Sequence, residues 1–150
     1  ARHYGAEVTG VDRPEKLDML RAIGADHVID YTREDFTRNG RTYDVILDTI
    51  GKSPFSGSLR SLKASGTYLN SNPGIFSSMQ MRLTSKRSGK KVFPWSAGYS
   101  TTNLLALKAL IDAGSIKAII DRRYPLEQIA EAHRYVESGH KQGNVVITLD

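Results

Sequence analysis

The chain of 150 residues contains no cysteine. This absence excludes disulfide bonds, cysteine-based zinc sites and thiol catalysis within the chain. No apolar run approaches the roughly 18 residues that a membrane-spanning helix needs, and no secretory signal pattern is visible. We therefore expect a cytoplasmic protein that has no membrane partner. The apolar content of 39% and charged content of 25% predict a globular domain with a real core.

Acidic residues are missing from one long segment. The stretch from Thr49 to Ile111 contains no Asp or Glu, whereas the remainder holds 12 basic and 16 acidic residues. Nine basic residues lie in this segment: Lys52, Arg60, Lys63, Arg82, Lys86, Arg87, Lys90, Lys91 and Lys108. Such a segment is typical of a solvated face, or of a surface that meets phosphates, nucleic acid or an acidic partner. The lack of interleaved exposed aromatics argues against nucleic acid.

Residues 7–31 follow the pattern of a strand, a helix and a second strand. The first strand stops at Asp12, and Pro14 lies where a helix can begin without losing a hydrogen bond. Gly24 lies where a helix commonly ends. The apolar residues of the helix recur at helical spacing, at Leu17, Leu20 and Ile23. A strand–helix–strand unit of this length predicts parallel strands joined by a right-handed crossover.

The rest of the chain continues this alternation. We predict strands at 43–50, 67–70, 91–95, 116–124 and 144–149, and helices at 54–62, 103–113 and 126–138. The nearly continuous apolar run 43–50 indicates a strand buried on both faces. Ser65-Gly66 suits a turn, and residues 75–89 fit either a helix or an irregular flap. The fold class is therefore α/β, a doubly wound parallel sheet, followed by a strand–helix–strand that packs on something else.

Two local details follow from the same patterns. Thr101 or Thr102 is expected to cap the helix 103–113 at its N-terminus. The helix 126–138 is expected to direct four side chains toward the protein interior, those of Ile129, Ala130, His133 and Val136. His133 therefore reads as a core or interface residue, and the four histidines show no metal-ligand spacing.

Asp12 is the first indication of function. In dinucleotide-binding folds, an acidic residue at the end of the second strand binds the ribose hydroxyls. It normally lies about 20 residues beyond a glycine-rich turn. Only eleven residues precede Asp12, so we expect that the sequence starts inside the helix that follows such a turn.

Four phrases resemble a known family: GADHVIDY (24–31), YDVILDTIG (43–51), ALIDAGSIK (109–117) and IDRRYPLEQIAEAHRYVESGHKQGNVVIT (120–148). They resemble the C-terminal half of the medium-chain dehydrogenase/reductase superfamily, in its quinone-oxidoreductase-like and zinc-type alcohol-dehydrogenase-like branch. The resemblance covers essentially the whole chain. It implies that residues 1–115 form a truncated NAD(P)-binding Rossmann domain that lacks the glycine-rich turn. Residues 116–150 would then be the C-terminal segment of a GroES-like catalytic domain.

The resemblance also implies a set of cofactor-binding residues. They are Asp12, Arg13, Lys16, Tyr31, Thr49, Ile50, Gly51, Leu69, Asn70, Ser71, Asn72, Lys141 and Asn144. Asp12 alone favours NAD, because a carboxylate repels a 2′-phosphate. Arg13 and Lys16 lie one turn apart and could clamp that phosphate, which tilts the expectation toward NADP. As alternatives, Lys16 is a solvated partner of Asp12, Tyr31 caps a sheet edge, and Lys141 is a surface lysine.

The function implied is that of the cofactor-binding portion of an NAD(P)H-dependent oxidoreductase. Such an enzyme transfers hydride to or from a quinone, enone, aldehyde or alcohol, and its cofactor carries the chemistry. No catalytic residue is assigned, and the family's zinc ligands lie in the other half, so we expect this chain to bind no zinc and to be inactive alone.

Two other readings stay open. The chain could be a non-catalytic binding module that uses its basic segment for nucleic acid or an acidic partner. It could also be a folded remnant that forms a homodimer through an edge strand at Lys91–Trp95.

Overall fold

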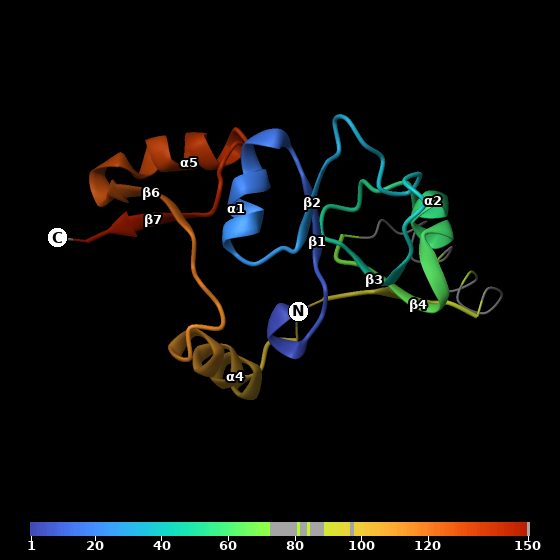
Figure 1. Cartoon of the computed structure of the whole chain (residues 1–150). Coiled ribbons are helices and arrows are strands. Elements are labelled where there is room, and N and C mark those ends of the chain that lie inside the picture. Colours follow the sequence, from blue (N-terminus) through green and yellow to red (C-terminus); the bar gives the residue numbers. More distant parts are fainter. Residues whose placement is uncertain (73–80, 82–83, 85–88, 97, 150) are drawn as a thin grey trace. The chain divides into compact units, whose positions relative to one another are not determined.

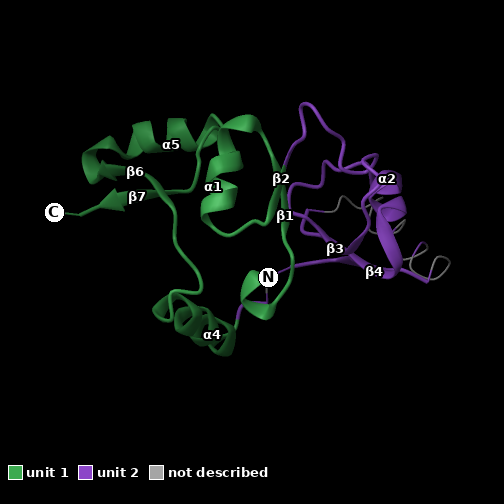
Figure 2. Cartoon of the chain, viewed as in Figure 1, with its two compact units in different colours: residues 1–28, 100–150 green, residues 29–99 purple. Residues whose placement is uncertain are grey.

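The computed structural model describes residues 1–72, 81, 84, 89–96 and 98–149. The chain divides into two compact units, residues 1–28 with 100–150, and residues 29–99 (Figure 2). The predicted domains 1–115 and 116–150 are based on the family resemblance and not on contacts within the chain. They stay a prediction. Most of 75–89, for which a helix or a flap was considered, lies outside the described residues.

The chain begins with the strand–helix–strand that the sequence predicts. A 3₁₀ turn, η1 (Arg2–Tyr4), precedes β1 (Thr9–Asp12). The helix consists of η2 (Pro14–Lys16) and α1 (Leu17–Ala22), and β2 (His27–Asp30) pairs with β1 in a two-stranded sheet (Figure 1). At Gly10 an added Cβ would lie 2.9 Å from a methyl group of Leu20, so glycine allows the helix to pack closely on the strand.

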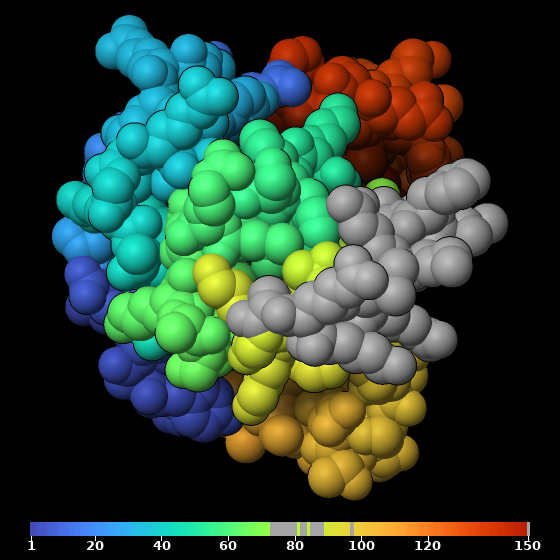
Figure 3. Space-filling view, turned by 90° about the vertical axis from the view of Figure 1, so that its right-hand side faces the viewer, coloured from blue at the N-terminus to red at the C-terminus, as the bar shows by residue number. Residues whose placement is uncertain are grey.

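The second unit is built on a parallel sheet of three strands. Its elements are β3 (Tyr43–Asp48), α2 (Phe55–Arg60), β4 (Leu62–Asn70) and β5 (Lys91–Pro94), and the strand order is β3-β4-β5. The core consists of Ile46, Leu62, Tyr68, Met81 and Val92, with Phe55 and Leu59 of α2 packed against it. The opposite side of α2 is open to solvent at Ser56 and Arg60, and Figure 3 shows this helix on the surface in green.

Two predictions about this sheet are wrong. β3 is not buried on both faces, because Val45 and Leu47 are 57% and 49% exposed while Ile46 packs into the core. Within the unit, α2 and Met81 supply the core on only one face of the strand. Ser65-Gly66 lies inside β4 rather than in a turn. The register between β3 and β4 shifts here, since Tyr43 pairs with Leu62 but Val45 pairs with Thr67. The extra residues of β4 form an irregularity of the bulge type.

The remaining elements are α4 (Thr101–Asp112), β6 (Ile120–Pro125), η3 (Leu126–Gln128), α5 (Ile129–Glu137) and β7 (Asn144–Thr148). β6 and β7 pair in parallel, so the predicted strand–helix–strand is confirmed. The cap of α4 is Ser100, whose Oγ accepts a hydrogen bond from the Asn103 amide at 3.1 Å, so the prediction of Thr101 or Thr102 is wrong.

The inner face of α5 also differs from the prediction. Ala132 is buried and Tyr135 half-buried, whereas Ile129, Ala130, His133 and Val136 are all exposed. The reason is that α5 packs against β6 and β7 on the side of Ala132. No helix in the described ranges combines the length and the apolar character needed to cross a membrane.

Candidate functional site

Two loops meet at the carboxyl ends of the paired strands β3 and β4. Asp48, the last residue of β3, lies opposite Asn70, the last residue of β4. The carboxyl ends of parallel strands are where α/β sheets bind ligands. The structure therefore brings together two groups of residues that the sequence singled out, Thr49–Gly51 after β3 and Leu69–Asn72 at the end of β4.

Hydrogen bonds tie these loops to each other. The Ser71 hydroxyl donates to the carbonyl oxygen of Thr49 at 2.8 Å, and the Ser71 amide donates to the carbonyl oxygen of Asp48 at 3.0 Å. The buried Asn70 accepts the Asn72 amide on its Oδ1 at 2.8 Å, and its carbonyl accepts the Trp95 amide at 2.8 Å. The loops therefore form one braced surface, which we call the cradle (residues 49–53 and 69–72).

Asp48 holds the first loop of the cradle through hydrogen bonds. It was not among the residues predicted from the sequence. Its side chain is 6% exposed. Oδ1 accepts the amides of Ile50 at 3.2 Å and Gly51 at 2.7 Å, and Oδ2 accepts the Ser53 amide at 3.1 Å. An acid at the end of an apolar strand, just before a glycine, was the available signal in YDVILDTIG, because buried carboxylates require donors.

Tyr68 supplies the fourth donor to this carboxylate. Its hydroxyl lies 3.0 Å from Asp48 Oδ2, and the residue is 1% exposed. Burial raises the pKa of the Tyr68 hydroxyl, and the nearby negative charge of Asp48 raises that pKa further. Tyr68 therefore stays a neutral donor at any ordinary pH.

Gly51 permits the tight turn of the first loop. Its φ is +74°, and an added Cβ would lie 2.9 Å from the carbonyl oxygen of Asn72. Both facts require glycine at this position. Beside it, Ile50 is 63% exposed, so the cradle presents an apolar side chain that suits the flat face of a ring or a sugar.

Asp12, Arg13 and Lys16 form a second group, in the first unit. Asp12 ends β1 and is half-buried, and its Oδ1 accepts the Arg13 amide at 2.8 Å. The Lys16 amide donates to the Arg13 carbonyl at 3.0 Å. The main chain thus turns immediately after the strand, which places one acid and two cations within four residues of the strand end.

Tyr31 directly follows β2, and the residue is 51% exposed. The turn around it is held by Asp30, whose Oδ1 accepts the hydroxyl of Thr32 at 2.6 Å and its amide at 2.8 Å. The Thr32 hydroxyl is the main reason that the pKa of the Asp30 carboxyl lies below its ordinary value.

Asn144 begins β7 and Lys141 lies in the loop before it, in the first unit. The side-chain amide of Asn144 donates to the carbonyl oxygen of Ile119 at 3.1 Å, and the Lys141 ammonium lies 3.3 Å from the Gly143 carbonyl. The loop before β7 is held by Asp121, which accepts the Gln142 amide and the Tyr135 hydroxyl, each at 2.7 Å. These two bonds, the amide first, lower the pKa of the Asp121 carboxyl.

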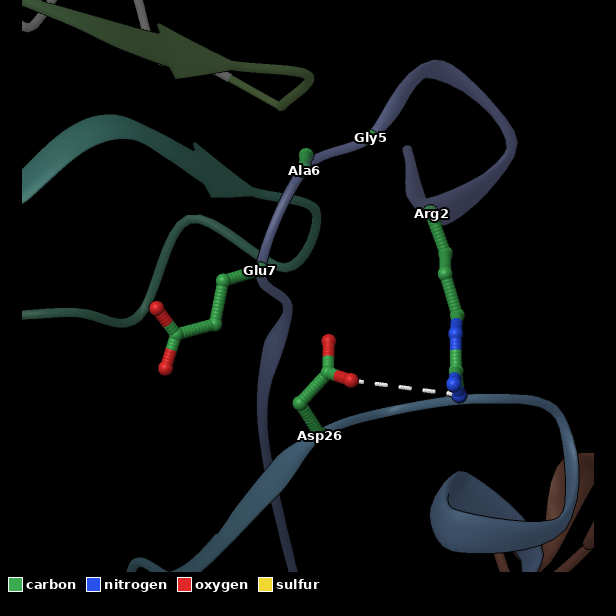
Figure 4. Close-up of a pocket in the computed structure, with 5 residues that line it drawn as sticks. All are labelled: Arg2, Gly5, Ala6, Glu7 and Asp26. Carbon is green, nitrogen blue, oxygen red and sulfur yellow. Dashed lines mark ion pairs between the residues drawn. The ribbon is translucent and has the colours of Figure 1, made fainter.

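A shallow pocket lies at the start of the first unit, and none of the predicted site residues lines it. Its lining is Arg2, Gly5, Ala6, Glu7 and Asp26. In Figure 4 the Arg2 guanidinium reaches toward Asp26, at 3.9 Å, while the carboxylate of Glu7 points away from that pair. Asp26 also accepts the Val8 amide at 2.8 Å. These contacts fasten the chain start to β1 and β2, and they indicate a structural role.

The described residues contain few side chains that could act together as metal ligands. Among them, no group of three His, Asp or Glu side chains could hold a metal ion, and the sequence has no cysteine. His27 contacts Glu7, with 2.6 Å between Nε2 and Oε1, but a pair alone does not form a zinc site.

Comparisons with known proteins relate the chain to dehydrogenases and oxidoreductases. Residues 23–147 match the family model described as zinc-binding dehydrogenase. The chain is 29% identical to the mitochondrial NAD(P)H oxidoreductase RTN4IP1 of Mus musculus, over 97% of this chain and 42% of that protein. It is also 29% identical to the chloroplastic NADPH-dependent alkenal/one oxidoreductase of Arabidopsis thaliana, over 98% of this chain and 35% of that protein.

Among solved structures, the quinone oxidoreductase from Coxiella burnetii is similar over 100% of this chain and 47% of its own, with a TM-score of 0.82 and 22% identity. This likeness confirms the α/β fold class and the Rossmann-type architecture. The chain spans less than half the length of each of these proteins.

Proposed function

Because the chain belongs to the zinc-binding dehydrogenase family of the medium-chain dehydrogenase/reductase superfamily, we propose that it is the dinucleotide-binding portion of an NAD(P)H-dependent oxidoreductase. The observation that carries the proposal is the cradle, in which two braced loops meet at the carboxyl ends of β3 and β4. The names of the two curated relatives, NAD(P)H oxidoreductase and NADPH-dependent alkenal/one oxidoreductase, support it.

The cofactor-binding residues of the proposal are those that the sequence singled out. Thr49–Gly51 and Leu69–Asn72 contact a sugar or ring of the dinucleotide, while Asp12, Arg13, Lys16 and Tyr31 bind its adenosine end. Lys141 and Asn144 approach the pyrophosphate or the nicotinamide of the cofactor. When bound, NAD(P)H supplies the hydride, and the residues of this chain orient it.

We propose NADP rather than NAD as the preferred cofactor. Two cations follow Asp12 within one turn, at Arg13 and Lys16, and an arginine binds a phosphate more strongly than it binds a hydroxyl. The alternative is NAD, bound by the Asp12 carboxylate through two ribose hydroxyls.

The zinc in the family's description does not fit this chain. The described residues offer no three-ligand cluster, so we propose that the chain binds no zinc. The substrate class of the whole enzyme remains our proposal of a quinone, enone, aldehyde or alcohol, and the cytoplasm remains the proposed compartment.

Calorimetric titration of the chain with NADPH and with NADH tests the proposal. We expect saturable binding, tighter for NADPH. Arg13→Ala and Lys16→Ala should each weaken NADPH binding about tenfold and leave NADH binding nearly unchanged, since one charge-assisted phosphate contact accounts for about 1.5 kcal/mol. Arg134→Ala, which removes an exposed cation on α5, is the matched control. Absence of binding for both dinucleotides would refute the proposal.

The basic segment supports a second candidate function, a module that binds nucleic acid or an acidic partner. Several of its lysines, however, already have partners within the chain. Lys63 pairs with Asp44 at 2.8 Å, Lys108 pairs with Asp112, and the Lys90 ammonium donates to the carbonyl oxygens of Leu59 and Leu62. RNA binding that weakens steeply with salt would favour this candidate. A homodimer through β5, an edge strand of the described three-stranded sheet, is likewise a proposal, and sedimentation as a monomer would contradict it.

A further inference from the structure

We propose that Asp48 and Tyr68 are positioning residues that hold the cradle in its binding shape before any dinucleotide arrives. The inference rests on the proposed function for what the cradle binds. The hydrogen bonds of Asp48 and Tyr68 that hold the cradle, which we call the brace, are a property of the free chain.

Asp48 is placed so that its single side chain defines the loop after β3. Three backbone amides, those of Ile50, Gly51 and Ser53, converge on its carboxylate within 2.7–3.2 Å. Such a ring of amides around a negative charge fixes the main chain of the loop, because each orphaned buried amide would cost free energy. The loop 49–53 therefore has one favoured conformation as long as the carboxylate is present.

Tyr68 locks the carboxylate in place from the sheet below. Its ring is buried in the core against Phe55 of α2, with ring centroids 5.5 Å apart, so its hydroxyl cannot follow a moving loop. The hydroxyl donates to the oxygen of Asp48 that also accepts the Ser53 amide. The hydrophobic core thus sets the orientation of Asp48, and Asp48 sets the loop.

The same brace extends to the loop after β4. The Ser71 amide donates to the Asp48 carbonyl, and the Ser71 hydroxyl donates to the Thr49 carbonyl. The two loops therefore shift together or not at all. Preorganisation of this kind raises affinity because the ordering entropy is not lost on binding.

The brace also limits what the first loop can recognise. Backbone amides in a tight loop are a common phosphate site, but here Asp48 already occupies the three amides with its own negative charge. The part of a dinucleotide that contacts residues 49–53 is therefore an uncharged one, a sugar or a ring, and not a phosphate.

Hydrogen exchange and NADPH titration of three variants test this inference. In the free wild-type chain, the amides of Ile50, Gly51 and Ser53 should be protected, and Asp48→Asn should reduce that protection at Ser53 most, since its amide nitrogen cannot accept. Tyr68→Phe should reduce protection at all three amides. Both variants should weaken NADPH binding at least fivefold.

Ile46→Val is the control, because it loosens the core of the same strand without touching the loops. It should lower the unfolding midpoint while leaving NADPH affinity and the three amides unchanged. The inference is overturned if Asp48→Asn leaves the exchange rates as in the wild type, or if Ile46→Val weakens NADPH binding as much as Asp48→Asn does. If the wild-type chain shows the protected amides but binds no NADPH, the proposed function fails and the brace stands.

Discussion

At the scale of single residues, the site depends on one position that requires glycine and on one buried carboxylate that requires its hydrogen-bond donors. Gly51 combines a left-handed conformation with a close approach to the second loop, and Asp48 collects four donors on two oxygens. Arg13 is exposed and Lys16 is half-buried, and neither adopts a positive φ, so their substitution should change NADPH affinity more than it changes stability.

The glycine can be tested by comparison with a second glycine of the same unit. Gly40 has a φ of +77° and open space around it, whereas Gly51 has a φ of +74° and a carbonyl oxygen 2.9 Å from an added Cβ. Gly40→Ala should cost about 1 kcal/mol of unfolding free energy for the conformation alone. Gly51→Ala should cost roughly 2–3 kcal/mol, measured by urea denaturation. Equal losses would mean that the approach of the two loops is not tight.

Asp121 should make the stability of the first unit depend on pH. Its pKa is lowered in the folded chain by the Gln142 amide and then by the Tyr135 hydroxyl. A lowered folded pKa stabilises the fold above the unfolded value of about 3.9, and that stabilisation is lost as the pH falls through the folded pKa. Asp121→Asn should therefore cost about 1 kcal/mol at pH 7, and the cost should shrink below about pH 4.

Tyr135→Phe is the control for this titration. It keeps the ring that lies 3.8 Å from the Arg122 guanidinium carbon, and it removes only the hydroxyl bond to Asp121. Its loss at pH 7 should be smaller than that of Asp121→Asn. A stability difference that stays constant from pH 7 to pH 2 would show that the carboxylate is not the group responsible.

At the scale of elements, the sequence predicted what local chemistry decides and failed where packing decides. The strand–helix–strand of residues 7–31 follows from apolar spacing and from Pro14 and Gly24, and the structure reproduces it. The inner face of α5 could not be predicted, because spacing alone cannot say which side meets β6 and β7. The burial of β3 was overestimated for the same reason, since an apolar run does not tell which faces are covered within the unit.

The candidate site divides in the same way. Thr49–Gly51 and Leu69–Asn72 followed from the family resemblance, and the structure places these groups beside each other. Asp48 and Tyr68 were missed because their importance lies in donors that converge from separate elements, which no local pattern reveals.

The cap of α4 provides a test at this scale. Ser100 Oγ accepts the Asn103 amide at 3.1 Å, so Ser100→Ala should destabilise the helix by about 1 kcal/mol. Thr101→Ala and Thr102→Ala should cost much less, because both lie inside the helix. Hydrogen exchange of the amides at the N-terminus of α4 measures the difference, and a larger effect for Thr102→Ala than for Ser100→Ala would contradict the assignment.

At the scale of the whole molecule, the residues proposed to bind the cofactor are distributed over two compact units. The second unit contributes the cradle and Tyr31, and the first contributes Asp12, Arg13, Lys16 and the start of β7. NADPH that binds the folded form of a unit should raise the unfolding temperature of that unit by mass action.

The most direct test of the central claim is an NMR titration of the isotope-labelled chain with NADPH. The account predicts saturable shifts concentrated in the amides of Thr49–Ser53, Ser71–Asn72 and the non-proline residues of Asp12–Lys16, with little change in α5 and α2. Shifts that are absent, or that are confined to the basic residues from Arg60 to Lys108 and leave the cradle and Asp12 unchanged, would contradict it.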